Sequence, residues 1–189
     1  MAVVETERLL LRPLSTEDLD DHHAVVGSDP DVTWSGTART LEESRTYLEE
    51  HRLHWAEHGF GMWAVIEKGS GRLLGHAGLQ YLEETGDVQV GYYLGKLAWG
   101  SGYATEAGRA ALRYGFEVLG LPHIVAVVRP ENRASQHVLS KLGLHRSRVA
   151  PHYGFVVEVW RIDAQQYRPE AIPFKVLHDD ASERAGSKP

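Results

Sequence analysis

The sequence VGYYLGKLAWGSGYATEA, residues 90–107, decides the fold. Its first part is rich in Val and Tyr and predicts a strand over residues 87–94. Beyond the glycines, apolar residues recur at helical spacing and predict a helix over residues 101–119. Gly100 and Gly102 lie at the junction, where backbone N–H groups and the helix dipole converge on one point that suits a phosphate. A plain glycine-containing turn is the alternative interpretation of the same residues.

A dinucleotide-binding fingerprint is a second way to interpret these glycines, and the sequence argues against it. The fingerprint requires a third glycine, but the matching position is Thr105. It also requires an acidic residue about 20 positions on, at the end of the next strand. That strand ends here at Arg129. The Rossmann interpretation therefore fails.

The rest of the chain predicts strands and helices around this stretch. Strands are expected over residues 8–13, 60–68, 72–82, 87–94, 123–129 and 155–162, and helices over residues 15–27, 40–59, 101–119 and 132–142. Strands that first form hairpins and then alternate with helices predict a mixed sheet with helices on its faces, an α/β fold. We expect one compact domain over residues 5–168, followed by a polar tail, residues 169–189, of which much is mobile or loosely packed.

Charge and cysteine content exclude several classes of function. The 189 residues carry a formal net charge of −6, which argues against broad binding to nucleic acid or anionic membranes. The chain has no cysteine, which rules out disulfide scaffolds, Cys-based zinc sites and thiol nucleophiles. The N-terminal residues do not resemble a signal peptide, and no stretch approaches the roughly 18 apolar residues of a membrane span. We therefore expect a cytoplasmic enzyme or binding domain.

Three motifs, in this order along the chain, resemble the GNAT superfamily of N-acetyltransferases. They are ERLLLRP at residues 7–13, the stretch at residues 90–107, and PENRAS with VLSKLGL at residues 130–135 and 138–144. The resemblance covers roughly residues 5–165. It points to the branch that contains the ribosomal-protein N-terminal-alanine acetyltransferases.

The resemblance implies a single-domain, mostly antiparallel sheet with helices on both faces. Two parallel strands splay apart in a V, and acetyl-CoA inserts between them like an added strand. The pantetheine arm is expected to bond the main chain of Tyr92, Tyr93 and Leu94. The pyrophosphate is expected on the backbone amides of Ser101, Gly102, Tyr103, Ala104 and Thr105. Asn132 matches a residue that contacts the pantetheine arm, and the alternative is that it only caps its helix.

The resemblance also suggests residues for the chemical step. Ser135 matches a Ser near the thioester sulfur, where Ser135 or a water that it holds would protonate the leaving thiolate. A purely local role in its helix is the alternative. Many relatives use a Tyr for this step where this chain has Leu139. Gln89 stands where related sequences carry Glu. The ribosomal-protein enzymes also have a Glu after the second motif, near residues 151–153, and the resemblance therefore makes His152 the candidate base. Trp34 is expected to border the acceptor site, and no metal is expected.

These features predict acetyl transfer from acetyl-CoA to a primary amine by direct attack, without a covalent enzyme intermediate. A protein N-terminal α-amine is one candidate acceptor, and a small-molecule amine or antibiotic is the alternative. A catalytically silent acyl-CoA-binding module is the rival from another class, because Gln89 and Leu139 lack the expected proton-transfer groups. The expected partners are acetyl-CoA and the amine, with no nucleic acid and no membrane. An exposed edge strand near the C-terminus would permit a homodimer.

Overall fold

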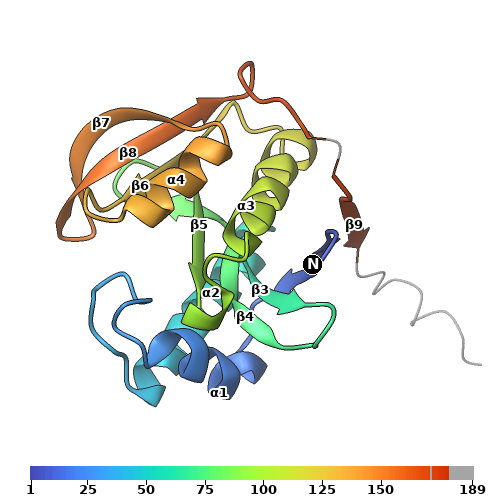
Figure 1. Ribbon diagram of the computed structural model, residues 1–189, viewed down its shortest axis with the longest axis vertical. Coiled ribbons are helices and arrows are strands. Elements are labelled where there is room, and N and C mark those ends of the chain that lie inside the picture. The colour runs from blue at the N-terminus through green and yellow to red at the C-terminus, as the bar shows by residue number, and fades with distance from the viewer. Residues whose placement is uncertain (171, 179–189) are drawn as a thin grey trace, which may run out of the picture.

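The computed structural model describes residues 1–170 and 172–178 of the chain. Within this part, the strands form one nine-stranded sheet in the order β7-β8-β6-β5-β4-β3-β2-β1-β9 (Figure 1). The strands are β1 (Ala2–Glu5), β2 (Leu9–Pro13), β3 (Met62–Glu67), β4 (Leu73–Leu82), β5 (Asp87–Leu94), β6 (His123–Val128), β7 (His145–His152), β8 (Phe155–Asp163) and β9 (Lys175–His178). The helices are α1 (Leu19–His22), α2 (Leu41–His58), α3 (Tyr103–Arg113) and α4 (Arg133–Lys141), with short turns η1 (Thr16–Asp18), η2 (His23–Gly27), η3 (Lys96–Ala98) and η4 (Tyr114–Val118).

One pair of neighbouring strands is parallel, and it opens into a V. All other neighbours in the sheet are antiparallel. Strands β5 and β6 run parallel and share only the register pair Gln89↔Val125. Beyond that pair, the carboxyl halves of β5 and β6 are not hydrogen-bonded to each other. The mixed sheet with a splay between two parallel strands is therefore confirmed.

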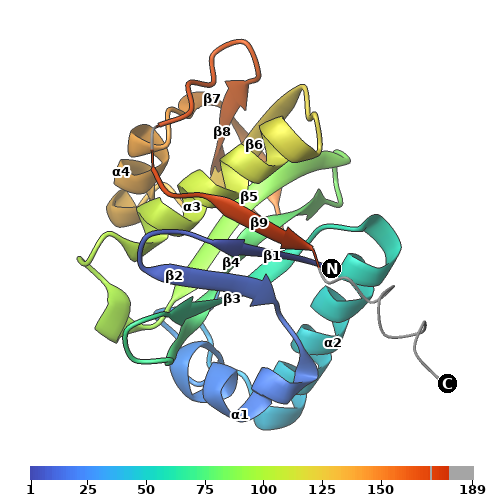
Figure 2. The same ribbon diagram turned by 90° about the vertical axis from the view of Figure 1, so that its right-hand side faces the viewer.

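Helices cover both faces of this sheet (Figure 2). Ala107, Ala110 and Ala111 of α3 are fully buried in the larger core cluster, which also contains Leu139 of α4 and Leu142, the residue directly after α4. On the opposite face, Leu48 of α2 packs in a separate core cluster. The small alanine side chains let α3 approach the sheet closely, beside the splay.

Local capping signals fix where the long helices begin and end. Thr40 caps α2 by accepting from the Glu43 backbone, and the Glu43 carboxylate bonds the Thr40 N–H in return, at 2.7 Å. Gly59 ends the helix in the left-handed conformation. The helix expected over residues 101–119 begins at Tyr103 as α3 and continues through η4. The helix expected over residues 15–27 is divided into η1, α1 and η2.

The sheet extends beyond the expected domain limits at both ends. Strand β1 starts at Ala2, and β9, inside the expected tail, pairs with it antiparallel. The physical reason is that β1 needs partners: Ala2 and Val4 are buried, and β9 bonds the outer edge of the strand. Just before the expected tail, Tyr167 stacks on Phe116 of η4 with ring centroids 4.7 Å apart. The rest of the expected mobile tail, residues 171 and 179–189, lies outside the described residues.

None of the described helices is long and apolar enough to cross a membrane. Nor does the described part of the chain gather three or more His, Cys, Asp or Glu side chains in an arrangement that could hold a metal ion.

Candidate functional site

A cavity of about 740 Å³ lies at the splay between β5 and β6. Its wall is built from the loop before α2, from β5, from the glycine turn and first turn of α3, and from the end of β6 with α4. The site residues expected from the sequence line this cavity, except Ser101 and His152. Those on the wall are Trp34, Tyr92, Tyr93, Leu94, Gly102, Tyr103, Ala104, Thr105, Asn132 and Ser135.

The glycine turn gives the cavity a wall of backbone N–H groups. Gly100 and Gly102 have φ of 72° and 81°, in the left-handed region that favours glycine. Gly102 is the N-cap of α3 and provides no capping side chain. The N–H groups of the first helical turn therefore have no acceptor within the helix. A helix start of this kind is suited to hold a phosphate.

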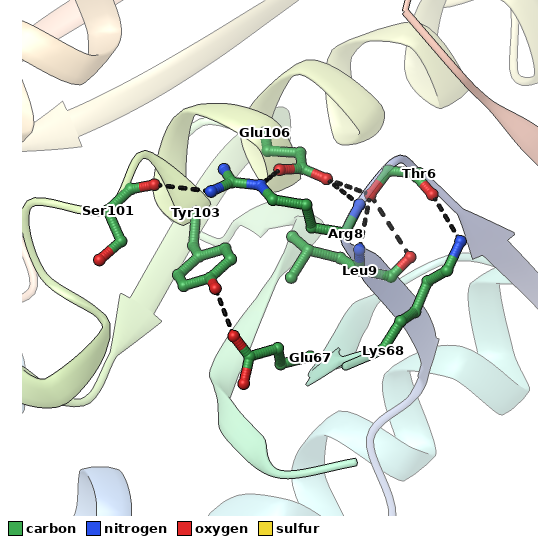
Figure 3. Close-up of polar contacts among 8 residues, drawn as sticks. All are labelled: Thr6, Arg8, Leu9, Glu67, Lys68, Ser101, Tyr103 and Glu106. Atoms are coloured by element: carbon green, nitrogen blue, oxygen red, sulfur yellow. Dashed lines mark hydrogen bonds and ion pairs between the residues drawn. The ribbon is translucent and has the colours of Figure 1, made fainter. Parts of the chain in front are cut away.

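The N-terminal turn of the chain, residues 6–9, packs behind the glycine turn (Figure 3). Arg8 forms an ion pair with Glu106 of α3, with Nε and Oε2 2.7 Å apart. Burial alone would raise the pKa of Glu106, but hydrogen bonds from Thr6 and Arg8 leave it lowered. Glu106 is therefore an ionised structural group.

A hydroxyl pair lies where α4 meets β5. The Tyr92 and Ser135 hydroxyl oxygens are 3.0 Å apart, and Tyr92 also donates to the Ser135 carbonyl at 3.1 Å. Burial raises the pKa of Tyr92, so its phenol stays protonated. Asn132 caps α4 by accepting from the Ser135 N–H at 3.0 Å. Sequence reasoning gave Tyr92 a main-chain role only, because a contact 43 residues away leaves no local signal.

Aromatic rings surround the wall on the α2 side of the sheet. The Trp34 ring meets Tyr153 edge to face, with centroids 5.7 Å apart, and Phe155 at 6.1 Å. Gln89 donates from Nε2 to the Tyr153 hydroxyl at 2.6 Å. Burial raises the pKa of Tyr153. Gln89 and Tyr153 thus supply neutral hydrogen-bonding groups and no ionised base.

Two expected residues do not reach the cavity. His152, the candidate base, is buried at 4% exposure and lies 3.4 Å from Glu84 through Nδ1, away from the wall. Its neighbour Tyr153 approaches Gln89 instead, because the β7–β8 turn holds Tyr153 at a φ of 51°. The Ser101 carbonyl accepts from Arg8 at 2.9 Å, on the side of the turn where Arg8 lies. The structure therefore places His152 and Ser101 outside the cavity wall, and their roles in the reaction stay predictions.

Arg129 lines the cavity and was not anticipated from the sequence as a site residue. Its guanidinium lies 3.8 Å from the centroid of the Phe155 ring. Its Nε and Nη2 atoms are buried without a hydrogen-bond partner among the described residues. A cation directly after an apolar strand was the only sequence signal for it.

Comparison with known proteins agrees with this geometry. The sequence profile of the family described as "Acetyltransferase (GNAT) domain" matches residues 8–145. The chain is 32% identical over 157 residues to the uncharacterized N-acetyltransferase p20 of Bacillus licheniformis, covering 81% of this chain and 88% of that protein.

Solved structures show the same architecture. The crystal structure of an acetyltransferase from Agrobacterium tumefaciens matches with a TM-score of 0.76 and 28% identity, covering 85% of this chain and 93% of that one. The ribosomal-protein-S5-alanine acetyltransferase from Vibrio fischeri matches with a TM-score of 0.67, 17% identity, and coverage of 88% and 99%. At that identity, the second likeness concerns the fold alone.

Proposed function

The chain belongs to the GNAT acetyltransferase family, and from this premise we propose that it acetylates an α-amine, or another amine of low pKa, with acetyl-CoA as donor. The observation that carries the proposal is the cavity at the splay, with a glycine-turn helix start on one wall and neutral groups on another. Each part of that wall has a task in the reaction.

The splayed part of β5 provides main-chain groups for the pantetheine arm. On one side, β5 is paired with β4 along its whole length, from Asp87 to Leu94. On the other side, it is paired with β6 only at Gln89. The peptide groups that follow on that side are not paired with β6 and can bond the amides of the pantetheine arm, as an added strand does. The Leu94 carbonyl is the exception, because it already accepts from Trp99 Nε1 at 2.6 Å. The backbone N–H groups at the start of α3 then hold the pyrophosphate.

In the transfer itself, the amine nitrogen bonds to the thioester carbonyl carbon while the carbon–sulfur bond breaks. The amine loses one proton, and the departing thiolate takes one up. Ser135 is the proposed donor to the thiolate, and the proton that the amine loses returns to Ser135 through water. Tyr92, protonated and hydrogen-bonded to Ser135, orients the Ser135 hydroxyl. Holding the two reactants together contributes several kcal/mol of the barrier reduction.

The wall favours an amine that deprotonates easily. Both of its carboxylates are ion-paired, because Asp31 lies 2.7 Å from Lys96 and Glu131 lies 3.8 Å from Arg129. This leaves the His137 imidazole as the candidate proton acceptor on the wall. At pH 7 an α-amine with a pKa near 8 is about 10% neutral, whereas a lysine near 10.4 is about 0.04% neutral. The difference is roughly 250-fold, which an enzyme acting on lysine must offset with a base.

A competition between two peptides tests the proposal. One starts with alanine and has a free α-amine, and the other has the same sequence with a blocked N-terminus and one internal lysine. Thiol release from acetyl-CoA should be faster with the free α-amine. Preference for the lysine peptide would refute the α-amine assignment, and preference for a small amine over both peptides would favour a small-molecule acceptor.

A further inference from the structure

The contacts behind the glycine turn connect parts of the chain that are far apart in sequence (Figure 3). The Glu106 carboxylate accepts from the Thr6 hydroxyl at 2.6 Å, the Arg8 N–H at 2.8 Å and the Arg8 Nε at 2.7 Å. Thr6 is in turn held by Lys68, whose Nζ donates to the Thr6 carbonyl at 2.9 Å. We call Thr6, Arg8 and Glu106 the brace.

The brace reaches the glycine turn through Arg8. Its Nη1 donates to the Ser101 carbonyl at 2.9 Å, and its guanidinium lies 4.4 Å from the centroid of the Tyr103 ring. Tyr103 is held in turn by a hydrogen bond from its hydroxyl to Glu67. Gly100 and Gly102 line the cavity, whereas Ser101 does not. Arg8 therefore binds the turn from outside the cavity.

Because the peptide bond is planar, the contact between Arg8 and the Ser101 carbonyl also fixes the direction of the Gly102 N–H. The described peptide bonds are trans, so the carbonyl of Ser101 and the N–H of Gly102 point in opposite directions. The adjoining glycines would otherwise let this peptide rotate at little cost. A carbonyl fixed on Arg8 keeps the Gly102 N–H directed toward the cavity side of the turn.

We propose that Arg8 is a positioning residue for acetyl-CoA: by holding the Ser101 carbonyl, it orients the backbone N–H groups that bind the pyrophosphate. The inference rests on the proposed use of acetyl-CoA at this cavity. Arg8 also offsets the charge of Glu106, which otherwise lies one turn into the helix that receives an anion.

The test compares two ligands that differ in the pyrophosphate. Acetyl-CoA carries it, and S-acetylpantetheine does not. Arg8→Gln should raise the dissociation constant for acetyl-CoA about tenfold, which is a typical loss of affinity for one charge-assisted contact. The same substitution should change the dissociation constant for S-acetylpantetheine less than about twofold, because this ligand does not reach the glycine turn. Arg52→Gln, which removes an exposed ion pair with Glu49 on α2, is the matched control and should change neither constant.

Two further variants keep the test decisive if Arg8→Gln destabilises the chain. Arg8→Lys retains the charge but lacks the fork that serves Glu106 and Ser101 together, so only part of the affinity should return. The double variant Arg8→Gln/Glu106→Gln removes both charges and should remain defective toward acetyl-CoA. Recovery to the parental constant would mean that Arg8 only neutralises Glu106, and would overturn the positioning role.

Two other outcomes would also overturn the inference. One is an equal loss of affinity for both ligands, which indicates general damage to the cavity. The other is an unchanged constant for acetyl-CoA in Arg8→Gln. Failure of the unaltered chain to bind acetyl-CoA would instead refute the proposed function, and the inference with it.

Discussion

Three buried histidines predict that the fold loses stability in mild acid. His22 and His76 are fully buried, with His22 Nε2 2.9 Å from His76 Nδ1. His76 Nε2 lies 2.9 Å from the Tyr47 hydroxyl, and the His51 ring meets the Tyr47 ring at 4.4 Å. Arg39 adds a positive charge beside them, 3.9 Å from the Tyr47 ring centroid. Protonating any of these imidazoles inside the fold is therefore costly.

The direction of the pH effect follows from the pKa values. Burial lowers the pKa of His22 to about 4 and that of His51 to about 3, and it lowers the pKa of His76 well below its usual range. In the unfolded chain each titrates near 6.5, so below that pH the unfolded state binds more protons. The free energy of unfolding therefore has its full value above about pH 7, and it falls as the pH drops through 6.5 toward the pKa values of the folded chain.

The magnitude is large relative to ordinary protein stability. At pH 5, a histidine with a folded pKa of about 4 or about 3 removes about 2 kcal/mol from the free energy of unfolding. His22 and His51 together remove about 4 kcal/mol, and His76 adds to this loss. Domains of this kind are stable by only about 5–15 kcal/mol. Much of the stability is therefore lost within two pH units of neutrality.

Urea denaturation at pH 7.5 and pH 5.0 measures the effect. His51→Leu should reduce the acid-induced loss by about 2 kcal/mol, because it removes one of the buried imidazoles. Within the described part of the chain, His51 Nε2 has no hydrogen-bond partner, so the substitution removes no bond there. His145→Leu, at an exposed position on β7, is the matched control and should keep the parental loss. The reasoning is refuted if His51→Leu loses as much stability between the two pH values as the parent chain.

Three further predictions concern the cavity. Gly102→Val should weaken acetyl-CoA binding in calorimetry and destabilise the chain by about 1–2 kcal/mol, because φ is 81° and a side chain there, whose Cβ would meet Arg8 Nη2 at 3.5 Å, is strained and distorts the turn. Parental affinity in the variant would refute a phosphate wall that depends on the conformation of this turn. Ser135→Ala should lower kcat at least about tenfold and change the dissociation constant for acetyl-CoA little. A purely local role of Ser135 predicts instead an unchanged kcat and a loss of at most about 1 kcal/mol in the free energy of unfolding. Trp34→Ala should raise KM for the acceptor amine and leave KM for acetyl-CoA unchanged in steady-state kinetics, and an equal rise in both would place Trp34 outside the acceptor site.

The sequence predicted the parts of the site that are encoded in short segments. The glycine turn, the start of α3 and the Asn132 cap each depend on residues within a few positions. In the structure α3 begins two residues after its expected start at residue 101, and Asn132 caps α4, the role that the sequence offered as an alternative. The partners of these segments were not predictable in the same way. Tyr92 meets Ser135, and Tyr153 rather than His152 approaches Gln89, because sheet register and a turn with positive φ decide which side chain faces the cavity.

By itself, the sequence determined the order of most elements, the ends of α2 and the family of the chain, because hydrophobic periodicity, capping and glycine conformation act over one or two helical turns. Only the tertiary structure decided that β1 and β9 join the sheet, that Arg8 pairs with Glu106 across 98 residues, and that three histidines share one buried cluster. Such contacts form when the sheet brings distant segments together. Their energies depend on burial and distance, and neither quantity can be derived from the spacing of residues along the chain.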